Sequence, residues 1–412
     1  MKNLAKIISA SNLFFVVANA LLLSPPGPDI QLGTATAELI DYSRTNVWGN
    51  NSDPRAFLIS VFYPLGVKPC SGGYRTEYVS KTVSDFEDGY FFQRGILGKL
   101  DYNSFESQFY QECSENNDGD YPVLIFSPGY FRTRLLYGVL AQTVAKFGYI
   151  VITVDHPYDA DIVVMPSGQV IAGVDETNLS TIEDYQGAVD TRVADFRFLL
   201  DQLEDPKLAN ALLPTVPYRL NVTKVGMFGH SLGGASSANL MITDDRVAGG
   251  INLDGSLWPP VSEVGLDQPF MFMGSVIDGT TAHSHFTDES WYDTWALLRG
   301  FKYDITLNNS RHSTYGDLTY LLESLDHVPM DNETLTVGTV DGGVAMVDIS
   351  TVVVDLFDWV LKGKERRKGG GERGDSTTFD VSIHEWFTMR LSVWHEDKIV
   401  GHTKVCELST LL

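Results

Sequence analysis

The residues with the clearest chemical meaning form a Gly-x-Ser-x-Gly pattern near the middle of the chain. Residues 229–233 read Gly-His-Ser-Leu-Gly, and they directly follow an apolar run at 224–228. A serine between two glycines, after a strand and before a helix, is typical of a nucleophile elbow, the tight turn that lifts one hydroxyl above a parallel sheet. Glycines suit the flanking positions because side chains there would collide with the adjoining strand and helix. The pattern therefore predicts that Ser231 is the nucleophile of a hydrolytic site.

A serine hydroxyl needs a histidine as general base and an acid behind that histidine. In doubly wound sheets with such an elbow the chain order is serine, acid, histidine, each at the carboxyl end of a strand. His312 fits this order best, because it lies in a polar loop directly after an apolar run at 301–307. Its rivals are His283 and His285, one strand earlier, and His327, beyond a predicted short helix. No third ligand with suitable spacing accompanies His283 and His285, so we expect two solvated histidines and no metal site.

Two aspartates compete for the role of the acid. Asp254 ends the apolar run that follows the elbow helix, and Asp278 follows the next apolar run. Most doubly wound hydrolases take the acid from the later strand and some take it from the earlier one, so the pattern alone leaves the choice open. His156 and His230 also lie next to the ends of predicted strands, and we expect both to be structural.

A tetrahedral intermediate also needs two backbone N–H donors aimed at its oxyanion. Leu232, directly after the serine, is the first predicted donor. The second is expected from the loop after the apolar run at 123–126, where Tyr130 follows Pro128 and Gly129. Pro128 has no N–H and presets the loop, and Gly129 permits a close backbone approach. We therefore predict an oxyanion hole made by the N–H groups of Tyr130 and Leu232.

The elements that would position these residues alternate between short β-branched runs and longer amphipathic stretches, as in βαβ units. This alternation predicts an α/β fold with a mostly parallel, doubly wound sheet and helices on both faces. Strands are expected at 57–63, 123–126, 149–154, 224–228, 250–253, 270–273 and 301–307, and helices at 135–147, 185–203 and 352–361. An irregular insertion is expected at about 64–120.

The bulk composition limits the partners of the chain. A net charge of -23 over 412 residues argues against nucleic acid, which demands clustered lysine and arginine. Residues 1–20 combine two lysines, an apolar stretch and an Ala-x-Ala site, which predicts a signal peptide cleaved after Ala20 and a secreted protein. No other segment is long and apolar enough to span a membrane.

Three further features concern processing and boundaries. Of the three cysteines, Cys70 and Cys113 are expected to form a disulfide, which leaves Cys406 over. A hydrolase domain is expected at 21–362, followed at 363–412 by a basic, glycine-rich linker and a tail with no evident place in the sheet. Sequons that secretion would make available for glycosylation lie at Asn50, Asn178, Asn221, Asn308 and Asn332.

Taken together, these residues resemble the secreted platelet-activating-factor acetylhydrolases of the α/β-hydrolase fold, especially their microbial, carboxylesterase-like members. The matching motifs lie at 32–33, 61–64, 126–129, 155–160, 229–234, 252–255 and 311–313. In that family the acid follows the strand after the elbow unit, which favours Asp254 and leaves Asp278 in reserve. Pro128 replaces a histidine that the family often has, and the tail departs from the family pattern.

The resemblance implies a calcium-independent serine esterase that needs no cofactor. Its expected substrates are small esters, or phospholipids with short or oxidised acyl groups at the sn-2 position. Separately, an aromatic stretch predicts transient contact to a lipid surface, the lining of an acyl pocket or the packed core of a cap helix, and it comprises Trp258, Phe286, Trp291, Tyr292 and Trp295. A broader lipase, cutinase or polyester hydrolase would share the elbow and the triad, because leaving-group preference depends on loops. A catalytically inactive scaffold that acts as a secreted binding protein is the alternative from another class.

Overall fold

The computed structural model describes residues 6–8, 20–48, 52–93, 101–115, 119–174, 181–214, 216, 219–327, 336–365 and 391–393. Its centre is a large mixed sheet made of β1 (Lys6–Ile8), β3 (Gln31–Thr45), β4 (Pro54–Ser71), β7 (Glu112–Glu115), β8 (Val123–Ser127), β9 (Ile150–Val154), β12 (Val225–His230), β13 (Val247–Leu253), β14 (Phe270–Gly274), β15 (Lys302–Leu307) and β16 (Leu391–Val393). The strand order is β1-β3-β4-β9-β8-β12-β13-β14-β15-β16, and β7 pairs with β4. The six strands β9, β8, β12, β13, β14 and β15 run parallel to one another, whereas β4 is antiparallel to β9, β3 is antiparallel to β4, and β16 is antiparallel to β15.

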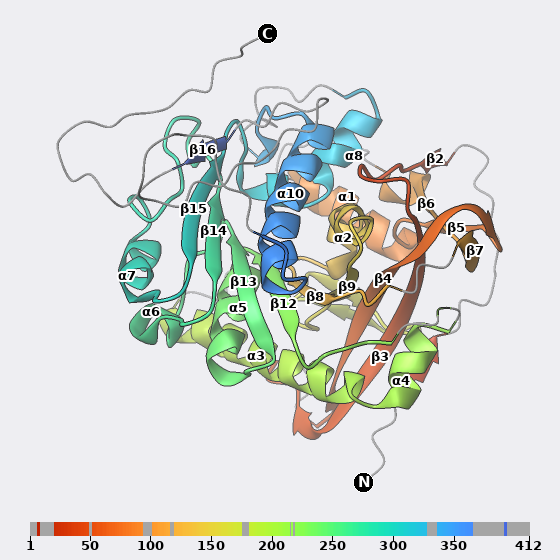
Figure 1. Cartoon of the computed structure of the whole chain (residues 1–412), viewed down its shortest axis with the longest axis horizontal. Helices are drawn as coiled ribbons and strands as arrows, with labels where there is room; N and C mark the ends of the chain where they lie inside the picture. Colours follow the sequence, from red (N-terminus) through yellow and green to blue (C-terminus); the bar gives the residue numbers. More distant parts are fainter. Residues whose placement is uncertain are drawn as a thin grey trace.

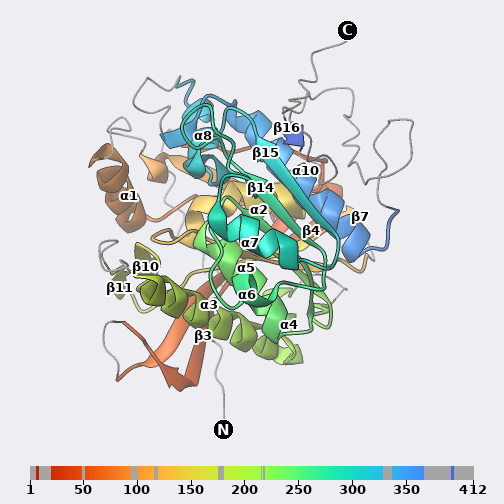
Figure 2. The same cartoon turned by 90° about the vertical axis from the view of Figure 1, so that its left-hand side faces the viewer.

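Helices cover both faces of this sheet (Figures 1 and 2). The helices α2 (Gly138–Ala145) and α10 (Gly342–Val360) pack on one face, and α3 (Ile182–Leu203) and α5 (Leu232–Thr243) pack on the other. The alternation of side chains along β8 explains the two layers. Leu124 and Phe126 pack in the core on the side of α2 and α10, while Val123 and Ile125 pack in the core on the side of α3 and α5. A parallel sheet buried on both faces needs such apolar runs. The predicted α/β-hydrolase fold is confirmed.

The remaining elements surround the sheet. The short helices are α1 (Lys81–Gln93), α4 (Pro206–Leu212), α6 (Val261–Val264), α7 (Glu289–Leu297) and α8 (Leu318–Ser324), with 3₁₀ turns at Tyr102–Ser104, Arg134–Tyr137 and His312–Tyr315. Two small sheets pair β2 (Leu21–Leu22) with β6 (Phe105–Phe109) and β5 (Tyr74–Glu77), and β10 (Ile162–Val164) with β11 (Val170–Ala172).

The segment at 64–120 is not irregular where the structure describes it. It contains the second part of β4, then β5, α1, β6 and β7. The long β4 explains part of the difference, because it continues past Pro64 to pair with β7 at the edge of the sheet. Cys70 on β4 and Cys113 on β7 are register partners joined by a disulfide, as expected from their shared segment.

The two ends of the chain are described only in part. Most of the expected signal peptide and tail, including Cys406, lies outside the described residues. β16 gives a short part of the tail a place beside β15, which the sequence analysis did not foresee. Within the described ranges, no helix combines the length and apolar character required to cross a bilayer.

Candidate active site

Ser231 occupies the turn between β12 and α5, at the carboxyl end of the central strands. Its backbone has φ 54° and ψ -126°, a left-handed conformation that non-glycine residues rarely adopt. A Cβ on Gly233 would lie 2.1 Å from the carbonyl oxygen of Ser127, and one on Gly229 would lie 2.4 Å from the backbone of Gly233. Only glycine at these two positions lets the turn close, which is why the pentapeptide places this serine in a strained, protruding position.

Asp254 and His312 are brought together from positions 58 residues apart. Asp254 directly follows β13, and His312 opens the 3₁₀ turn after β15. The Nδ1 atom of His312 lies 2.7 Å from Oδ2 of Asp254, whose carboxylate is buried, while the His312 side chain is 54% exposed. The opposite ring nitrogen of His312 is thereby left for a substrate-side proton. Ser231 and His312 line the same pocket.

The reserve acid lies elsewhere. Asp278 is exposed in the loop after β14, where its oxygens accept hydrogen bonds from the N–H and hydroxyl groups of Thr280 and Thr281. These bonds make it the organising residue of its own turn. Within the part of the chain that the structure describes, no hydrogen bond joins Asp278 to His312, so the carboxylate that lies against His312 is Asp254.

Asp254 is an ionised carboxylate in a buried setting. Burial alone would raise its pKa, but hydrogen bonds from His283 and His312 outweigh burial and hold the pKa well below its usual range. Ser275 adds two more donors, its N–H at 2.6 Å and its hydroxyl at 2.9 Å. Four hydrogen bonds therefore fix the carboxylate against His312.

The expected oxyanion loop curves over the elbow. The N–H of Gly129 donates to the Tyr137 hydroxyl at 3.2 Å, and the same hydroxyl lies 2.8 Å from Nδ1 of His230. Tyr130, the next residue, lines the pocket together with Ser231. Leu232 is the first residue of α5, so its N–H has no acceptor within the helix. Its side chain is buried in the core, and only its backbone can serve the site.

A buried arginine that the sequence analysis missed holds this loop in place. Arg192, on α3, donates to the carbonyl oxygens of Pro128 at 2.5 Å and Gly129 at 3.1 Å. Its charge is balanced by Asp159, to which it forms a two-point ion pair. The signal that could have found it is the residue type, because arginine on the buried face of a long helix needs a carboxylate partner.

The histidines expected to be structural behave as such. His156 is buried and bonds Asp195 at 2.9 Å through Nδ1, and His230 packs with its ring 4.4 Å from that of His312. Burial, reinforced by the neighbouring His312, holds the pKa of His230 well below its usual value, so its ring is neutral.

The expectation that His283 and His285 are solvated is wrong. Both are buried, at 8% and 3% exposure. His283 bonds Asp254 and Asp288, and His285 bonds Asp304 at 2.6 Å. Buried histidines are common where a carboxylate can accept their N–H groups. Asp288 lies five residues after His283, whereas Asp254 and Asp304 come from neighbouring strands that local sequence does not connect to these histidines. Among the described residues no group of three or more histidines, cysteines and acids could hold a metal ion.

The pocket above Ser231 is small. Its volume is about 60 Å³, and it is lined by Tyr102, Gly129, Tyr130, Arg132, Leu136, Tyr137, His230, Ser231, His312, Ser313, Gly316, Asp317 and Leu318. Arg132 contributes a cation to its wall, with Nη1 3.8 Å from the Asp161 carboxylate. The arrangement can carry out acyl transfer, because Ser231 and His312 line one cavity and Asp254 lies directly behind His312.

Comparisons with known proteins bear on the fold and on the class of enzyme. A ferulic acid esterase from Streptomyces cinnamoneus superimposes with a TM-score of 0.67 at 26% identity, covering 87% of this chain and 97% of that structure. The fold and the match define the protein as an α/β-hydrolase and a carboxylic ester hydrolase.

Three further similarities narrow the comparison to particular esterases. Residues 74–165 match the model of "Platelet-activating factor acetylhydrolase, isoform II". A probable 1-alkyl-2-acetylglycerophosphocholine esterase from Arthroderma benhamiae is 29% identical over 88% of this chain and 93% of its own length. A platelet-activating factor acetylhydrolase from Cavia porcellus is 27% identical over 44% of this chain and 46% of its own. The chain is therefore similar to platelet-activating-factor acetylhydrolases over residues 74–165 and to an acetylglycerophosphocholine esterase over most of its length.

Proposed function

We propose that this esterase hydrolyses short acyl esters through a Ser231–His312–Asp254 triad. The observation that carries the proposal is the 2.7 Å contact between His312 and Asp254 beside the strained Ser231, in one pocket. In the first half-reaction Ser231 Oγ attacks the ester carbonyl carbon while His312 takes its proton. Asp254 orients the imidazole and stabilises the imidazolium. The N–H groups of Tyr130 and Leu232 stabilise the oxyanion.

Collapse of this intermediate breaks the bond to the alcohol, which leaves with the proton held by His312. In the second half-reaction His312 takes a proton from water as the water attacks the acyl-Ser231 ester. The proton then returns to Ser231 Oγ, which releases the carboxylic acid. No step needs a metal ion or an organic cofactor.

The size and charge of the pocket favour a short acyl group on a phospholipid-like alcohol. The small volume of the pocket, about 60 Å³, supports a short acyl chain rather than a fatty acyl chain. The Arg132 guanidinium would attract a phosphodiester, as arginine does wherever phosphate is recognised. The names of the two curated relatives point to the same substrate class, the sn-2 acetyl ester of a glycerophosphocholine.

Initial rates on p-nitrophenyl esters from acetyl to palmitoyl, without calcium, test the reaction and the acyl length. We expect activity confined to short chains and abolished in Ser231→Ala. A maximum at long chains would favour a lipase or cutinase instead. A folded wild-type protein that hydrolyses none of the esters, including an sn-2-acetyl glycerophosphocholine, would favour the binding-protein alternative.

The alcohol side of the substrate is tested separately with Arg132→Gln. If Arg132 attracts the phosphodiester, this variant raises KM for a 2-acetyl glycerophosphocholine about tenfold or more and changes KM for p-nitrophenyl acetate much less. Equal effects on both substrates would remove Arg132 from headgroup recognition.

We also propose that the protein is secreted and touches lipid surfaces transiently. The amino-terminal pattern and the Cys70–Cys113 bridge support secretion, because disulfides persist in oxidising compartments. Exposed apolar side chains after β14 and on α7 support surface contact, namely Ile277, Phe286 and Tyr292. Amino-terminal sequencing of protein from the medium should begin at Leu21, and phosphatidylcholine vesicles should retain the wild type more than Phe286→Ser.

A further inference from the structure

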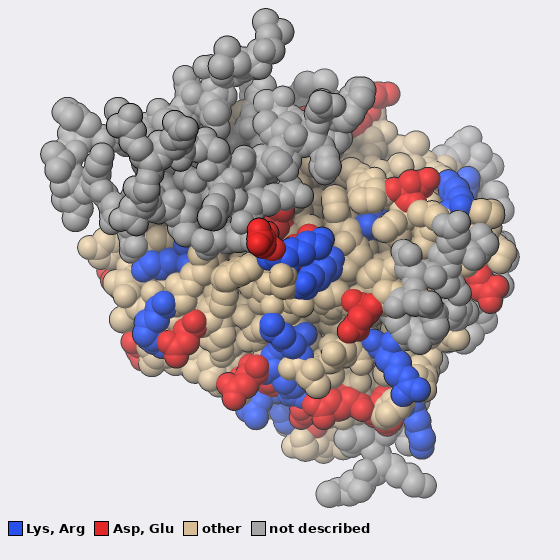
Figure 3. Space-filling view, in the orientation of Figure 1, with Lys and Arg blue, Asp and Glu red and all other residues tan. Residues whose placement is uncertain are grey.

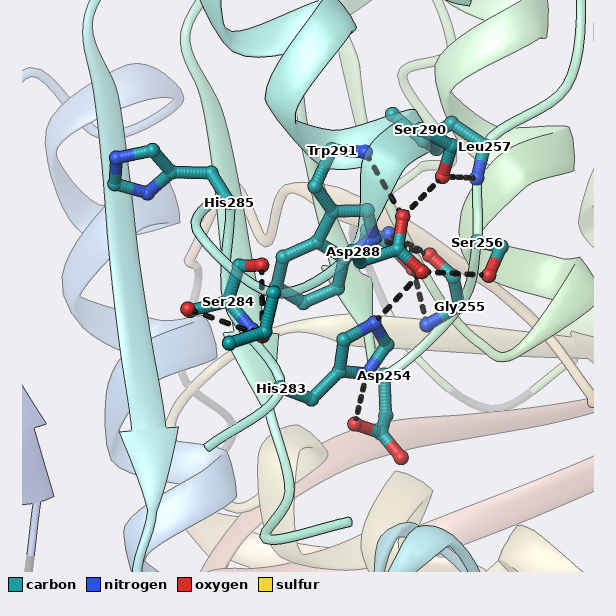
Figure 4. Close-up of polar contacts among 12 residues, drawn as sticks. Asp254, Gly255, Ser256, Leu257, His283, Ser284, His285, Asp288, Ser290 and Trp291 are labelled. Atoms are coloured by element: carbon teal, nitrogen blue, oxygen red, sulfur yellow. Dashed lines mark hydrogen bonds and ion pairs between the residues drawn. The ribbon is translucent and has the colours of Figure 1, made fainter. Parts of the chain in front are cut away.

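Asp254 carries two imidazoles, one on each oxygen. His312 Nδ1 lies 2.7 Å from Oδ2, and His283 Nδ1 lies 2.7 Å from Oδ1. Figure 4 shows His283 between Asp254 and Asp288, with its ring along that of Trp291. His283 comes from the loop after β14, the strand next to β13, so the carboxyl ends of adjacent parallel strands bring it to the acid. The simple Ser-His-Asp scheme has no part for this second histidine.

The second ring nitrogen of His283 also faces a carboxylate. Its Nε2 atom lies 3.2 Å from Oδ2 of Asp288. A neutral imidazole has one N–H and one lone pair, so it could donate to only one of these acids, whereas the cation donates to both. The ring centroids of His283 and Trp291 are 4.2 Å apart with an interplanar angle of 21°, a contact that also favours a cation. The geometry therefore calls for a protonated His283.

Asp288 is anchored as an anion. It caps the amino terminus of α7 by accepting from the N–H of Trp291 at 2.9 Å, and it accepts from the hydroxyls of Ser290 at 2.5 Å and Ser256 at 2.9 Å. Burial would raise its pKa, but hydrogen bonds from His283 and these partners hold the pKa below its usual range. A capping carboxylate so well supplied with donors keeps its charge.

The other titratable groups around His283 are already paired with each other. His285 bonds Asp304, on β15, and its ring stacks on Trp295 at 4.2 Å. In Figure 4 His285 points away from Asp254. On the far side of Asp254 stands His312. Burial is the largest influence on the pKa of His283 and lowers it, but hydrogen bonds to Asp254 and Asp288 outweigh burial and raise the pKa to about 9.

We propose that His283 is a positioning residue that acts as a standing imidazolium behind the acid of the triad. It holds the Asp254 carboxylate in the plane that meets His312, and its positive charge offsets part of the Asp254 charge that His312 feels. Because less negative charge acts on His312, we expect the enzyme to keep its activity in a more acidic medium than it would without this cation. The inference rests on the proposed roles of Ser231, His312 and Asp254.

The test is the pH dependence of kcat/KM for p-nitrophenyl acetate in the wild type, His283→Asn and Asp288→Asn. In His283→Asn the amide N–H₂ can replace the donation of Nδ1 to Asp254, but the charge is gone. We expect the acidic limb of the profile to move up by about one pH unit, because a cation near His312 has been removed. Asp288→Asn, which weakens the hold on the proton of His283, should move the limb the same way by less.

The matched control is His285→Asn. His285 is also a buried histidine that bonds an aspartate and stacks on a tryptophan, but it does not touch Asp254. The acidic limb of the pH profile of kcat/KM should not move in this variant, even if the variant is less stable than the wild type. A limb that does not move in folded His283→Asn, or that moves as far in His285→Asn, would overturn the proposal.

Two measurements separate this inference from the proposed function and from failed folding. If Ser231→Ala keeps its activity, the proposed triad is wrong. If Ser231→Ala is inactive but the acidic limb of the pH profile does not move in His283→Asn, the triad is supported and the proposed role of His283 is wrong. If His283→Asn does not fold, the wild type still decides. In nitrogen-15 NMR spectra of the imidazole groups, assigned by comparison with Asp288→Asn and His285→Asn, His283 should have both nitrogens protonated at pH 7.5, and a neutral ring would contradict the proposal.

Discussion

Asp254 follows β13 and contacts side chains from the loops after β14 and β15. It has a left-handed backbone with φ 60°, and its carboxylate accepts from His312, from His283 and twice from Ser275. Its rival Asp278 satisfies both oxygens within its own turn. Two aspartates that look equivalent in sequence, each just after a strand, are separated by what their carboxylates accept.

The two aspartates form a matched pair for mutation. Asp254→Asn should lower kcat by about 10⁴-fold, because the amide cannot hold His312 in the productive tautomer or stabilise its cation. Asp278→Asn should leave kcat within about threefold of the wild type. Rates on p-nitrophenyl acetate at saturating substrate, with melting curves to confirm folding, decide the matter. A dead Asp278→Asn beside an active Asp254→Asn would reverse the assignment.

Among the elements, α3 does most to hold the catalytic loops on the sheet. Arg192 reaches from this helix to the carbonyls of residues 128 and 129, and Asp195, one turn later, binds Arg55 of β4 at 2.6 Å. All of these charged groups are buried and paired, and a buried pair is costly to break on one side only. The helix thus fixes the oxyanion loop relative to the elbow.

Removal of Arg192 should affect stability and catalysis together. Arg192→Gln leaves the buried Asp159 without its cation, so we expect the free energy of unfolding to fall by about 3–5 kcal/mol. The loosened loop should lower kcat/KM by about tenfold or more, since small displacements of catalytic donors are costly. Arg197→Gln, exposed on the same helix, is the control and should change stability by less than about 0.5 kcal/mol. Urea unfolding and ester hydrolysis measure both, and equal behaviour of the two variants would refute this role.

Burial explains which strands and helices could be predicted from the sequence. The parallel strands β8, β9 and β12–β15 could be predicted because a strand buried on both faces is apolar throughout. β3 was missed because its half-buried positions carry Thr34, Thr36 and Glu38, which break the apolar run. α10 begins ten residues before its predicted start, because Asp341 caps a helix whose first residues are glycines. Local pattern shows burial and turns, and it misses elements whose stability comes from the rest of the fold.

The same limit applies to the site. Ser231, His312 and the oxyanion loop could be predicted because each is tied to a strand end and to the chemistry of its neighbours. The contacts of Arg192 with Asp159 and of His283 with Asp254 could not be predicted, since the paired residues are 33 and 29 positions apart on different segments. Residues that support a site through buried charge are found only when the fold is known.

At the scale of the whole molecule, a disulfide links two strands at the edge of the sheet and the net charge is acidic. The net charge is -23, and on the face in Figure 3 basic and acidic side chains lie next to one another, with no continuous basic area among the described residues. The Cys70–Cys113 bridge joins β4 to β7 at the edge, and neither strand lines the catalytic pocket. Stability and catalysis should therefore be separable here.

Removal of the bridge tests that separation. The cysteines are 43 residues apart, and a closed loop of this length constrains the unfolded chain by up to about 4 kcal/mol. We expect the Cys70→Ser, Cys113→Ser double variant to lose about 2–4 kcal/mol in urea unfolding and to keep its kcat at 25 °C within about twofold. A variant of unchanged stability would show that the bridge does not form, and a folded but inactive one would tie this edge to the site.

Covalent labelling of the nucleophile tests the central claim most directly. The folded protein would be treated with a fluorophosphonate probe, digested, and the adduct located by mass spectrometry, with Ser231→Ala as the control. We predict one adduct per chain, on the peptide that contains Ser231, and none in the variant. A wild type that stays unlabelled while folded, or an adduct on another serine that persists in Ser231→Ala, would contradict the account.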